Sequence, residues 1–183
     1  MLLATTVNST NELAQILLLQ QQNLVKLLSE EDIRSEGFVT LNYTMHSLQQ
    51  MHDLSPSIII KDGSSVVAYA LVVLKEGRKF FPPLESMFQN LDAIIYQDRP
   101  LAAQPFYVMG QICIAKGYRG KGLFDVLYEK HKEVFQHQYP FVLTDISARN
   151  VRSLRAHQRI GFKTINTYRD ELDDWSVVLW DWR

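Results

Sequence analysis

Cysteine is almost missing from this chain of 183 residues, which has only Cys113. A single cysteine cannot form an internal disulfide, so a reducing cytoplasm is the expected compartment. An excess of basic charge is also missing, because 19 Lys and Arg against 20 Asp and Glu give a net charge of −1. This balance argues against a general nucleic-acid-binding protein, which normally carries a basic face.

Long hydrophobic runs are absent as well. No stretch approaches about 18 apolar residues, so the sequence predicts no membrane span. The start, MLLATTVNSTNELAQILLLQQQNL, lacks the basic beginning of a secretory signal, and polar residues interrupt its apolar stretches. With 46% apolar and 21% charged residues and no internal repeat, residues 1–183 are expected to form a single soluble domain.

Strand and helix patterns alternate along the chain. The clearest is a hairpin over 57–74, two β-branched runs joined at Asp62-Gly63. Further strands are predicted at 2–7, 105–115, 141–148, 162–169 and 175–182. Helices are predicted at 8–28 (one or two), 44–54, 82–96, 123–137 and 150–160. Residues 29–44 are expected to be a polar connection that ends in a short extended piece.

This order predicts a mixed α/β sheet of six or seven strands, mostly antiparallel, with helices on both faces. The strand–helix–strand stretch from 105 to 148 implies one parallel pair within it.

The segment KGYRGKGLF, residues 116–124, follows a strand directly and opens a helix. The first amides of a helix have no partners inside it and carry a partial positive charge, which favours phosphate binding. Gly120 and Gly122 would let an anion approach the backbone, and Arg119 and Lys121 add charge. The spacing G-x-x-G-x-G is neither the dinucleotide fingerprint nor a Walker loop. By itself, therefore, the segment fits a solvated turn as well as a phosphate site.

A second motif, NVRSLRAHQRIGF, begins 28 residues after Gly122, again between a strand and a helix. Together, ICIAKGYRGKGLF and NVRSLRAHQRIGF resemble the two acetyl-CoA signatures of the GNAT superfamily of N-acyltransferases. The specific resemblance covers residues 105–165, and the order of elements fits before that. It implies the GNAT fold, with a splayed central pair of parallel strands.

The resemblance also implies which residues bind acetyl-CoA, the expected co-substrate; no metal is implied. The strand edge would hold the acyl and pantetheine amides, and the following loop would hold the pyrophosphate through backbone amides. Asn150 would bond the pantetheine arm, with the small Ser153 one helical turn later. Phe124 departs from the signature, which has Gly or Ala there. The implied strand-edge and loop residues are Ile112, Cys113, Ile114, Arg119, Gly120, Lys121, Gly122, Leu123 and Phe124.

Two residues are catalytic candidates by the same resemblance. His157 stands where the family often has a Tyr that protonates the leaving thiolate, and Asp145 precedes the motif Asn by five residues, where some relatives have a Glu base. The alternatives are a His157 that only packs and an Asp145 that pairs with Arg149 or Arg152. Cys113 is not expected to be a nucleophile, because direct transfer needs none. Gln111 could position a water or an amine.

The sequence therefore predicts an N-acetyltransferase that moves acetyl from acetyl-CoA to a primary amine by direct transfer. The alternative is a module that binds CoA or acyl-CoA without turnover, as a sensor or scaffold. The acceptor would be a small amine or a peptide N-terminus, and a nucleic acid or a membrane is not expected as a partner. The sequence does not identify the acceptor, and it does not decide between a monomer and a homodimer.

Overall fold

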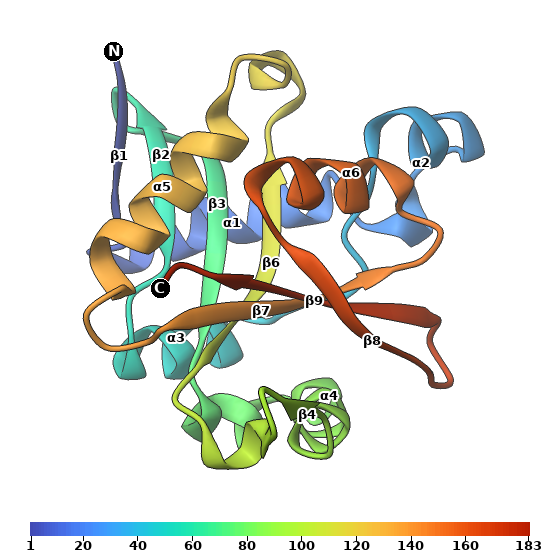
Figure 1. Ribbon diagram of the computed structural model, residues 1–183. Coiled ribbons are helices and arrows are strands. Elements are labelled where there is room, and N and C mark those ends of the chain that lie inside the picture. Colours follow the sequence, from blue (N-terminus) through green and yellow to red (C-terminus); the bar gives the residue numbers. More distant parts are fainter.

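The computed structural model describes residues 1–33 and 35–183, and its centre is one seven-stranded sheet in the order β1-β2-β3-β6-β7-β9-β8 (Figure 1). The pairing is antiparallel except between β6 and β7, which run parallel. The predicted sheet is thus confirmed, including its one parallel pair. The strands are β1 (Leu2–Thr6), β2 (Ile58–Asp62), β3 (Ser65–Val73), β6 (Tyr107–Ile114), β7 (Phe141–Ser147), β8 (Lys163–Arg169) and β9 (Asp174–Asp181).

Helices cover both faces of this sheet, as the sequence predicts. One hydrophobic cluster joins α1 (Thr10–Gln21), α3 (Met45–Leu54) and α4 (Pro82–Asp92) to one face. A second cluster joins α5 (Leu123–Phe135) and α6 (Val151–Ile160) to the other face. Among the described residues, no helix is both long enough and apolar enough to cross a membrane.

Local sequence explains several of the element boundaries. Ser9 caps α1, Thr44 forms a capping box with Ser47 at the start of α3, and Asn150 caps α6. The hairpin turn of β2 and β3 uses Gly63 at φ +60°, a conformation that favours glycine.

The segment 29–44 differs from its prediction. Instead of a polar connection it begins with a helix, α2 (Glu30–Glu36), capped by Ser29. Three acidic residues in the first turn suit a helix N-terminus, and Glu36 pairs with Arg119 and Arg152 from distant elements. The helix thus depends in part on tertiary ion pairs, which the local pattern could not reveal.

Two other boundaries also differ. The helix predicted over 82–96 ends at Asp92, and the chain then forms a small separate hairpin of β4 (Ile95–Tyr96) and β5 (Arg99–Pro100). On α3, Leu48 and Met51 are buried, whereas Leu54 at its end is 41% exposed. The short 3₁₀ turns are Val25–Leu27, Lys75–Phe80, Leu101–Ala103 and Lys116–Tyr118.

The parallel pair separates soon after it begins. The β6–β7 register pairs Tyr107 with Val142 and Val108 with Leu143, and no pair follows these two in the described ladder. In Figure 1, β6 and β7 run in clearly different directions beyond this point. Gly110 lies at the separation, where an added Cβ would come within 2.5 Å of Val73 Cγ2, so the strand requires glycine there.

Candidate active site

Two pockets lie where β6 and β7 separate, and they share the residues between them: Phe38, Val39, Ile112, Asn150 and Ser153. The first, which we call the loop pocket, extends to Gly120, Gly122 and Phe124. The second, the strand pocket, extends to Asp145 and Tyr168. The two motifs of the sequence therefore meet around one continuous hollow.

The loop of residues 116–124 presents free backbone donors to the loop pocket. The amides of Gly120, Lys121, Gly122, Leu123 and Phe124 form no hydrogen bond to any described residue. Gly120 and Gly122 have φ of +71° and +77°, and a Cβ on either would meet no atom within 4 Å. The space beside both α-carbons is thus open, and the loop has free backbone donors, as a phosphate cradle requires.

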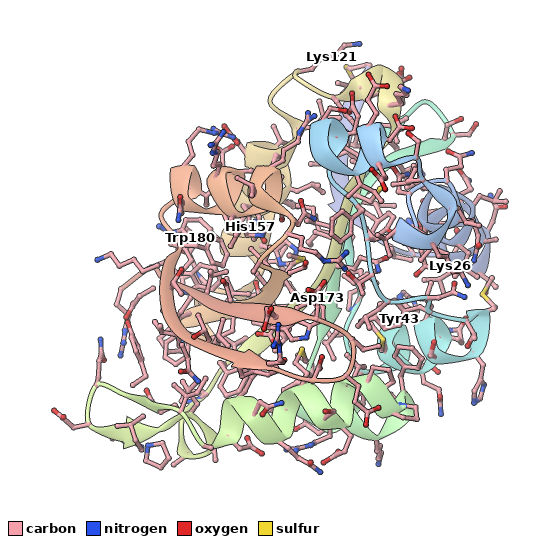
Figure 2. The ribbon with its side chains drawn as sticks, turned by 90° about the vertical axis from the view of Figure 1, so that its right-hand side faces the viewer. Lys26, Tyr43, Lys121, His157, Asp173 and Trp180 are labelled. Atoms are coloured by element: carbon pink, nitrogen blue, oxygen red, sulfur yellow. The ribbon has the colours of Figure 1, made fainter. Side chains whose placement is uncertain are left out.

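Two of the cations of this loop, Arg119 and Lys121, have different surroundings. The Arg119 guanidinium donates to Glu36, to Asn23 Oδ1 and, through Nε, to the Ile114 carbonyl at 3.0 Å. The Lys121 side chain extends from the tip of the loop, away from the body of the protein (Figure 2). Arg119 therefore fastens α2 against the loop, and the free donors of the cradle are backbone amides.

Phe124, the departure from the signature, is a wall of the loop pocket. Its ring centroid lies 5.0 Å from that of His157, edge to face, and 5.2 Å from that of Tyr128. The Phe124 side chain thus packs into the core while its backbone amide stays free. A large residue at this position therefore leaves the backbone donor available.

Asn150 is buried and already bonded at both polar ends. Its Oδ1 accepts from the Ser153 amide at 3.2 Å, and its Nδ2 donates to the Phe38 carbonyl at 2.9 Å. It lines both pockets, so its second N–H and second lone pair are its remaining groups for a ligand. Ser153 lines both pockets too.

His157 is 1% exposed and held by two neighbours. Nδ1 lies 2.8 Å from the Ser153 carbonyl, to which it must donate, and Nε2 then accepts from the Tyr128 hydroxyl at 2.6 Å. Burial lowers the pKa of His157 to about 4, against the effect of the Ser153 carbonyl. The residue is therefore a neutral imidazole near pH 7, and its one N–H is bonded within the helix.

Asp145 lies on β7 and lines the strand pocket. Its Oδ2 accepts from the Tyr168 hydroxyl at 2.5 Å, and its Oδ1 is buried without a hydrogen-bond partner among the described residues. Burial raises its pKa to about 7, the Tyr168 bond lowers it, and the charge of Asp170 raises it further. A carboxyl group with these properties can bind and release a proton near neutral pH.

The predicted strand-edge residues all line the loop pocket: Ile112, Cys113 and Ile114. Burial raises the pKa of the Cys113 thiol to about 12, which suits an inert side chain rather than a nucleophile. Gln111 accepts from the Tyr69 hydroxyl at 2.6 Å and donates to the Leu41 carbonyl at 2.7 Å. Gln111 therefore holds the segment around Leu41 against β6, a structural role that its position in the sequence does not reveal.

Several lining residues were missed by the sequence analysis. Tyr168 and Asp170 come from β8 and the turn after it, and Pro83 and Met87 come from α4. The acidic segment DELDD, residues 170–174, is visible in the sequence, but the sequence does not indicate which of its carboxylates faces inward. Among the described residues, no three His, Cys, Asp or Glu side chains gather where they could bind a metal ion.

Comparison by sequence gives no relative for this chain. No protein-family model matches it. No curated protein matches it either.

Comparison by structure does give relatives. A GNAT-family acetyltransferase from Streptococcus agalactiae is similar at a TM-score of 0.68 and 14% identity, over 100% of this chain and 96% of that one. An N-acetyltransferase from Staphylococcus aureus matches at 0.60 and 16%, over 99% and 98%. The NatC complex bound to Gag peptide and CoA matches at 0.66 and 10%, over 100% and 99%. The chain therefore has the fold of the GNAT acetyltransferases.

Proposed function

We propose that this protein is an acetyl-CoA-dependent N-acetyltransferase that moves the acetyl group directly to a primary amine within a ternary complex. The observation that carries the proposal is the meeting of the two pockets at Ile112, Asn150 and Ser153. One pocket leads to free helix-terminal amides, and the other leads to a carboxyl group with a pKa near 7. A phosphate-bearing acyl donor and an amine could thus be held end to end.

The chain's own groups fit acetyl-CoA, which would supply the activated thioester. The free amides from Gly120 to Phe124 suit its pyrophosphate, and the open space at Gly120 and Gly122 lets a phosphate approach. Arg152 and Arg159 also line the loop pocket, where they are paired with Glu36 and Asp125. The β6 edge at residues 112–114 would hold the pantetheine arm by its backbone.

Asp145 is the proposed general base. An amine must be neutral to attack, and a carboxylate with a pKa near 7 accepts its proton at the working pH. Tyr168 holds Oδ2 in place, which leaves Oδ1 to take the proton directly or through one water. A positioned base of this kind typically contributes about 10²- to 10⁴-fold to the rate.

Backbone N–H groups of β6 beyond Val108 are the proposed oxyanion stabilisers. They belong to the part of β6 that is no longer paired with β7, so they need not be withdrawn from that ladder. Donors that are already oriented need no reorganisation at the moment of reaction, and they act strongly where water is excluded.

His157 enters the proposal as a residue that shapes the pocket, because both of its ring nitrogens are engaged. A thiol with a pKa of about 8.5 can leave as the thiolate without an acid. The acid role that the family resemblance implies for His157 stays a prediction, and a variant at this position tests it.

The decisive experiment measures free thiol released from acetyl-CoA in the presence of a panel of primary amines, beside calorimetric titration with CoA. The proposal expects CoA binding and amine-dependent thiol release that falls at least a hundredfold in Asp145→Asn. CoA binding without release for any amine would favour the non-catalytic module. Failure to bind CoA would reject both functions.

A further inference from the structure

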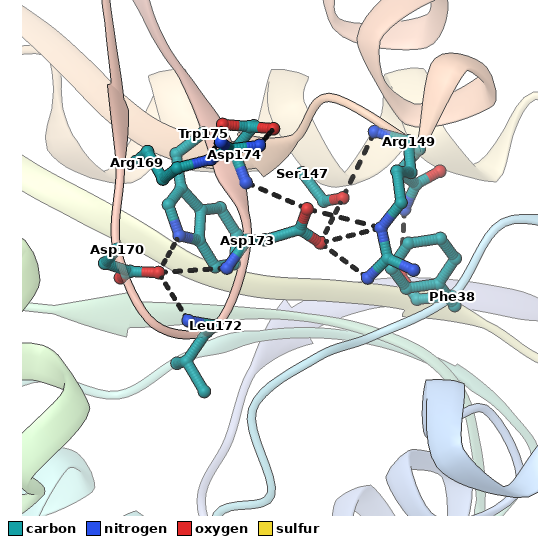
Figure 3. Close-up of polar contacts among 10 residues, drawn as sticks. Phe38, Ser147, Arg149, Arg169, Asp170, Leu172, Asp173, Asp174 and Trp175 are labelled. Atoms are coloured by element: carbon teal, nitrogen blue, oxygen red, sulfur yellow. Dashed lines mark hydrogen bonds and ion pairs between the residues drawn. The ribbon is translucent and has the colours of Figure 1, made fainter.

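The strand pocket has an uneven charge. None of the described residues that line it is a Lys or an Arg, whereas two of them, Asp145 and Asp170, are carboxylic acids. Arg149 is nearby, but it is paired with Asp173, at 2.7 Å between Nη2 and Oδ2 (Figure 3). Among the described residues, therefore, the lining of this pocket carries negative charge and no positive charge to balance it.

Asp170 is rigidly placed and yet has one oxygen free. Its Oδ1 accepts from the Leu172 amide, the Asp173 amide and the Trp175 indole, at 2.8, 3.0 and 2.8 Å (Figure 3). Its Oδ2 makes no hydrogen bond to any described residue. The turn between β8 and β9 thus fixes the carboxylate and leaves an acceptor atom for a ligand.

Apolar side chains make up much of the remaining wall. They come from three separate elements: Leu41 before α3, Pro83 and Met87 on α4, and Leu172 and Trp175 around the β8–β9 turn. Leu172 is 53% exposed, which places it at the mouth of the pocket. An acceptor seated here would bury an apolar body and present its amine to Asp145.

From this wall and this charge, we infer that the acceptor is a primary amine on an apolar or aromatic body with no carboxylate beside the amine. The inference rests on the proposed function and names the substrate class of its acceptor pocket. A free α-amino acid would bring its carboxylate close to Asp145 and Asp170, where no described Lys or Arg lines the pocket to offset the repulsion. Small amines and peptide N-termini that begin with an apolar residue share the required chemistry.

The test compares acceptors that differ in one group. Thiol release is measured with phenethylamine, L-phenylalanine and L-phenylalaninamide, and with an amidated peptide that begins with phenylalanine. We expect kcat/KM for phenylalaninamide to exceed that for phenylalanine by roughly a hundredfold, because Asp145 and Asp170 repel the carboxylate of phenylalanine. Comparison of kcat/KM for the peptide and for phenethylamine tells whether a peptide N-terminus or a small amine is the better acceptor.

Asp170→Asn tests the residue itself. The amide oxygen can still accept from the three donors of the turn, so the fold is preserved while the charge is removed. We expect kcat/KM for phenethylamine to fall roughly tenfold and the discrimination against phenylalanine to shrink by a similar factor. Glu171→Gln removes a charge from the same turn at an exposed residue outside the pocket, and should leave both values within about twofold.

Two results would overturn the inference while the proposed function stands: equal use of phenylalanine and its amide, or a preference for a diamine without an apolar body. If no amine gives turnover, the same preference is measured as binding of phenethylamine and phenylalanine to the protein saturated with CoA. Equal binding there would also overturn it. Absence of CoA binding, in contrast, contradicts the proposed function.

Discussion

The Tyr168 hydroxyl donates to Asp145 Oδ2 at 2.5 Å, although the two residues lie on strands that are not neighbours. Tyr168 belongs to β8 and Asp145 to β7, and β9 lies between them in the sheet. The tyrosine side chain therefore reaches over β9 and fixes a carboxylate whose other oxygen is buried and unpaired among the described residues. Only the assembled sheet brings these two groups together.

Removal of the Asp145 carboxylate should impair turnover and spare CoA binding. In Asp145→Asn the amide cannot accept a proton, so we expect kcat to fall about 10²- to 10⁴-fold. The Kd for CoA should change less than about threefold, because the residue lines the strand pocket and not the loop pocket. Steady-state kinetics and calorimetry measure the two effects, and near-normal turnover would contradict the assignment of the base.

The same variant should be more stable than the wild type in alkaline solution. The ordinary pKa of the Asp145 carboxyl is 3.8, and burial raises it to about 7 in the folded protein. The stability that comes from the protonated form is present below pH 3.8 and is lost as the pH rises through 7. We expect Asp145→Asn to gain about 4 kcal/mol in the free energy of unfolding at pH 8 to 9, measured by urea denaturation.

This gain should disappear near pH 4. Equal stability of the two proteins at both pH values would show that the carboxyl group is not perturbed by its surroundings.

Tyr168→Phe should move the acid limb of the pH–rate profile. Burial raises the pKa of Asp145 and the hydrogen bond from Tyr168 lowers it. Loss of this hydrogen bond should therefore raise the pKa. A hydrogen bond to a charged group contributes about 1.5 to 3 kcal/mol, which corresponds to about one to two pH units. We expect the limb in kcat/KM to move upward by that amount, and an unchanged profile would mean that Asp145 does not control it.

His157→Gln separates a packing role from an acid role. The amide oxygen of glutamine can still accept from the Tyr128 hydroxyl, which limits damage to the core. Because both ring nitrogens of His157 are already bonded to Tyr128 and Ser153, turnover at pH 7 to 8 should stay within about tenfold of the wild type. A loss of a hundredfold or more with intact CoA binding would instead establish the acid role.

The variant should also resist acid better. The ordinary pKa of 6.5 falls to about 4 for His157 in the folded protein, so the associated stability is present above pH 6.5 and is lost as the pH falls through 4. Circular dichroism at stepped pH should show a shallower loss for His157→Gln. A second buried histidine, His131, has its pKa lowered to about 3 and should keep part of the acid sensitivity.

Gly120→Ala should weaken CoA binding beyond what backbone strain explains. Gly63 offers a matched control, because both glycines have positive φ, +71° and +60°, and a Cβ on either would meet nothing within 4 Å. Each substitution should cost about 1 to 2 kcal/mol in stability. Only Gly120→Ala, at the cradle, should raise the Kd for CoA, by roughly tenfold or more, and equal effects on Kd would contradict the cradle.

Local patterns in the sequence predict two structural features that line the loop pocket, the glycine loop and the start of the helix after Asn150. An apolar strand followed by glycines and a helix start indicates free amides at Gly120 and Gly122, and the Asn150 cap follows from its place before an amphipathic helix. These features depend on neighbours within a few residues. The helix α2 was missed although its Ser29 cap and acidic first turn are local signals; what these signals could not reveal is that Glu36 is held by Arg119 and Arg152, which lie more than 80 residues away.

The sequence by itself determined the order along the chain of the main-sheet strands and of the helices other than α2, the parallel pair and the glycine loop, since hydrophobic period, turn residues and caps act over short distances. Only the tertiary structure decided the chemistry of the individual side chains. Burial made His157 a neutral, doubly bonded imidazole and raised the pKa of Asp145 toward 7. Both outcomes depend on desolvation by residues from distant parts of the chain, and the identity of a residue does not reveal its desolvation.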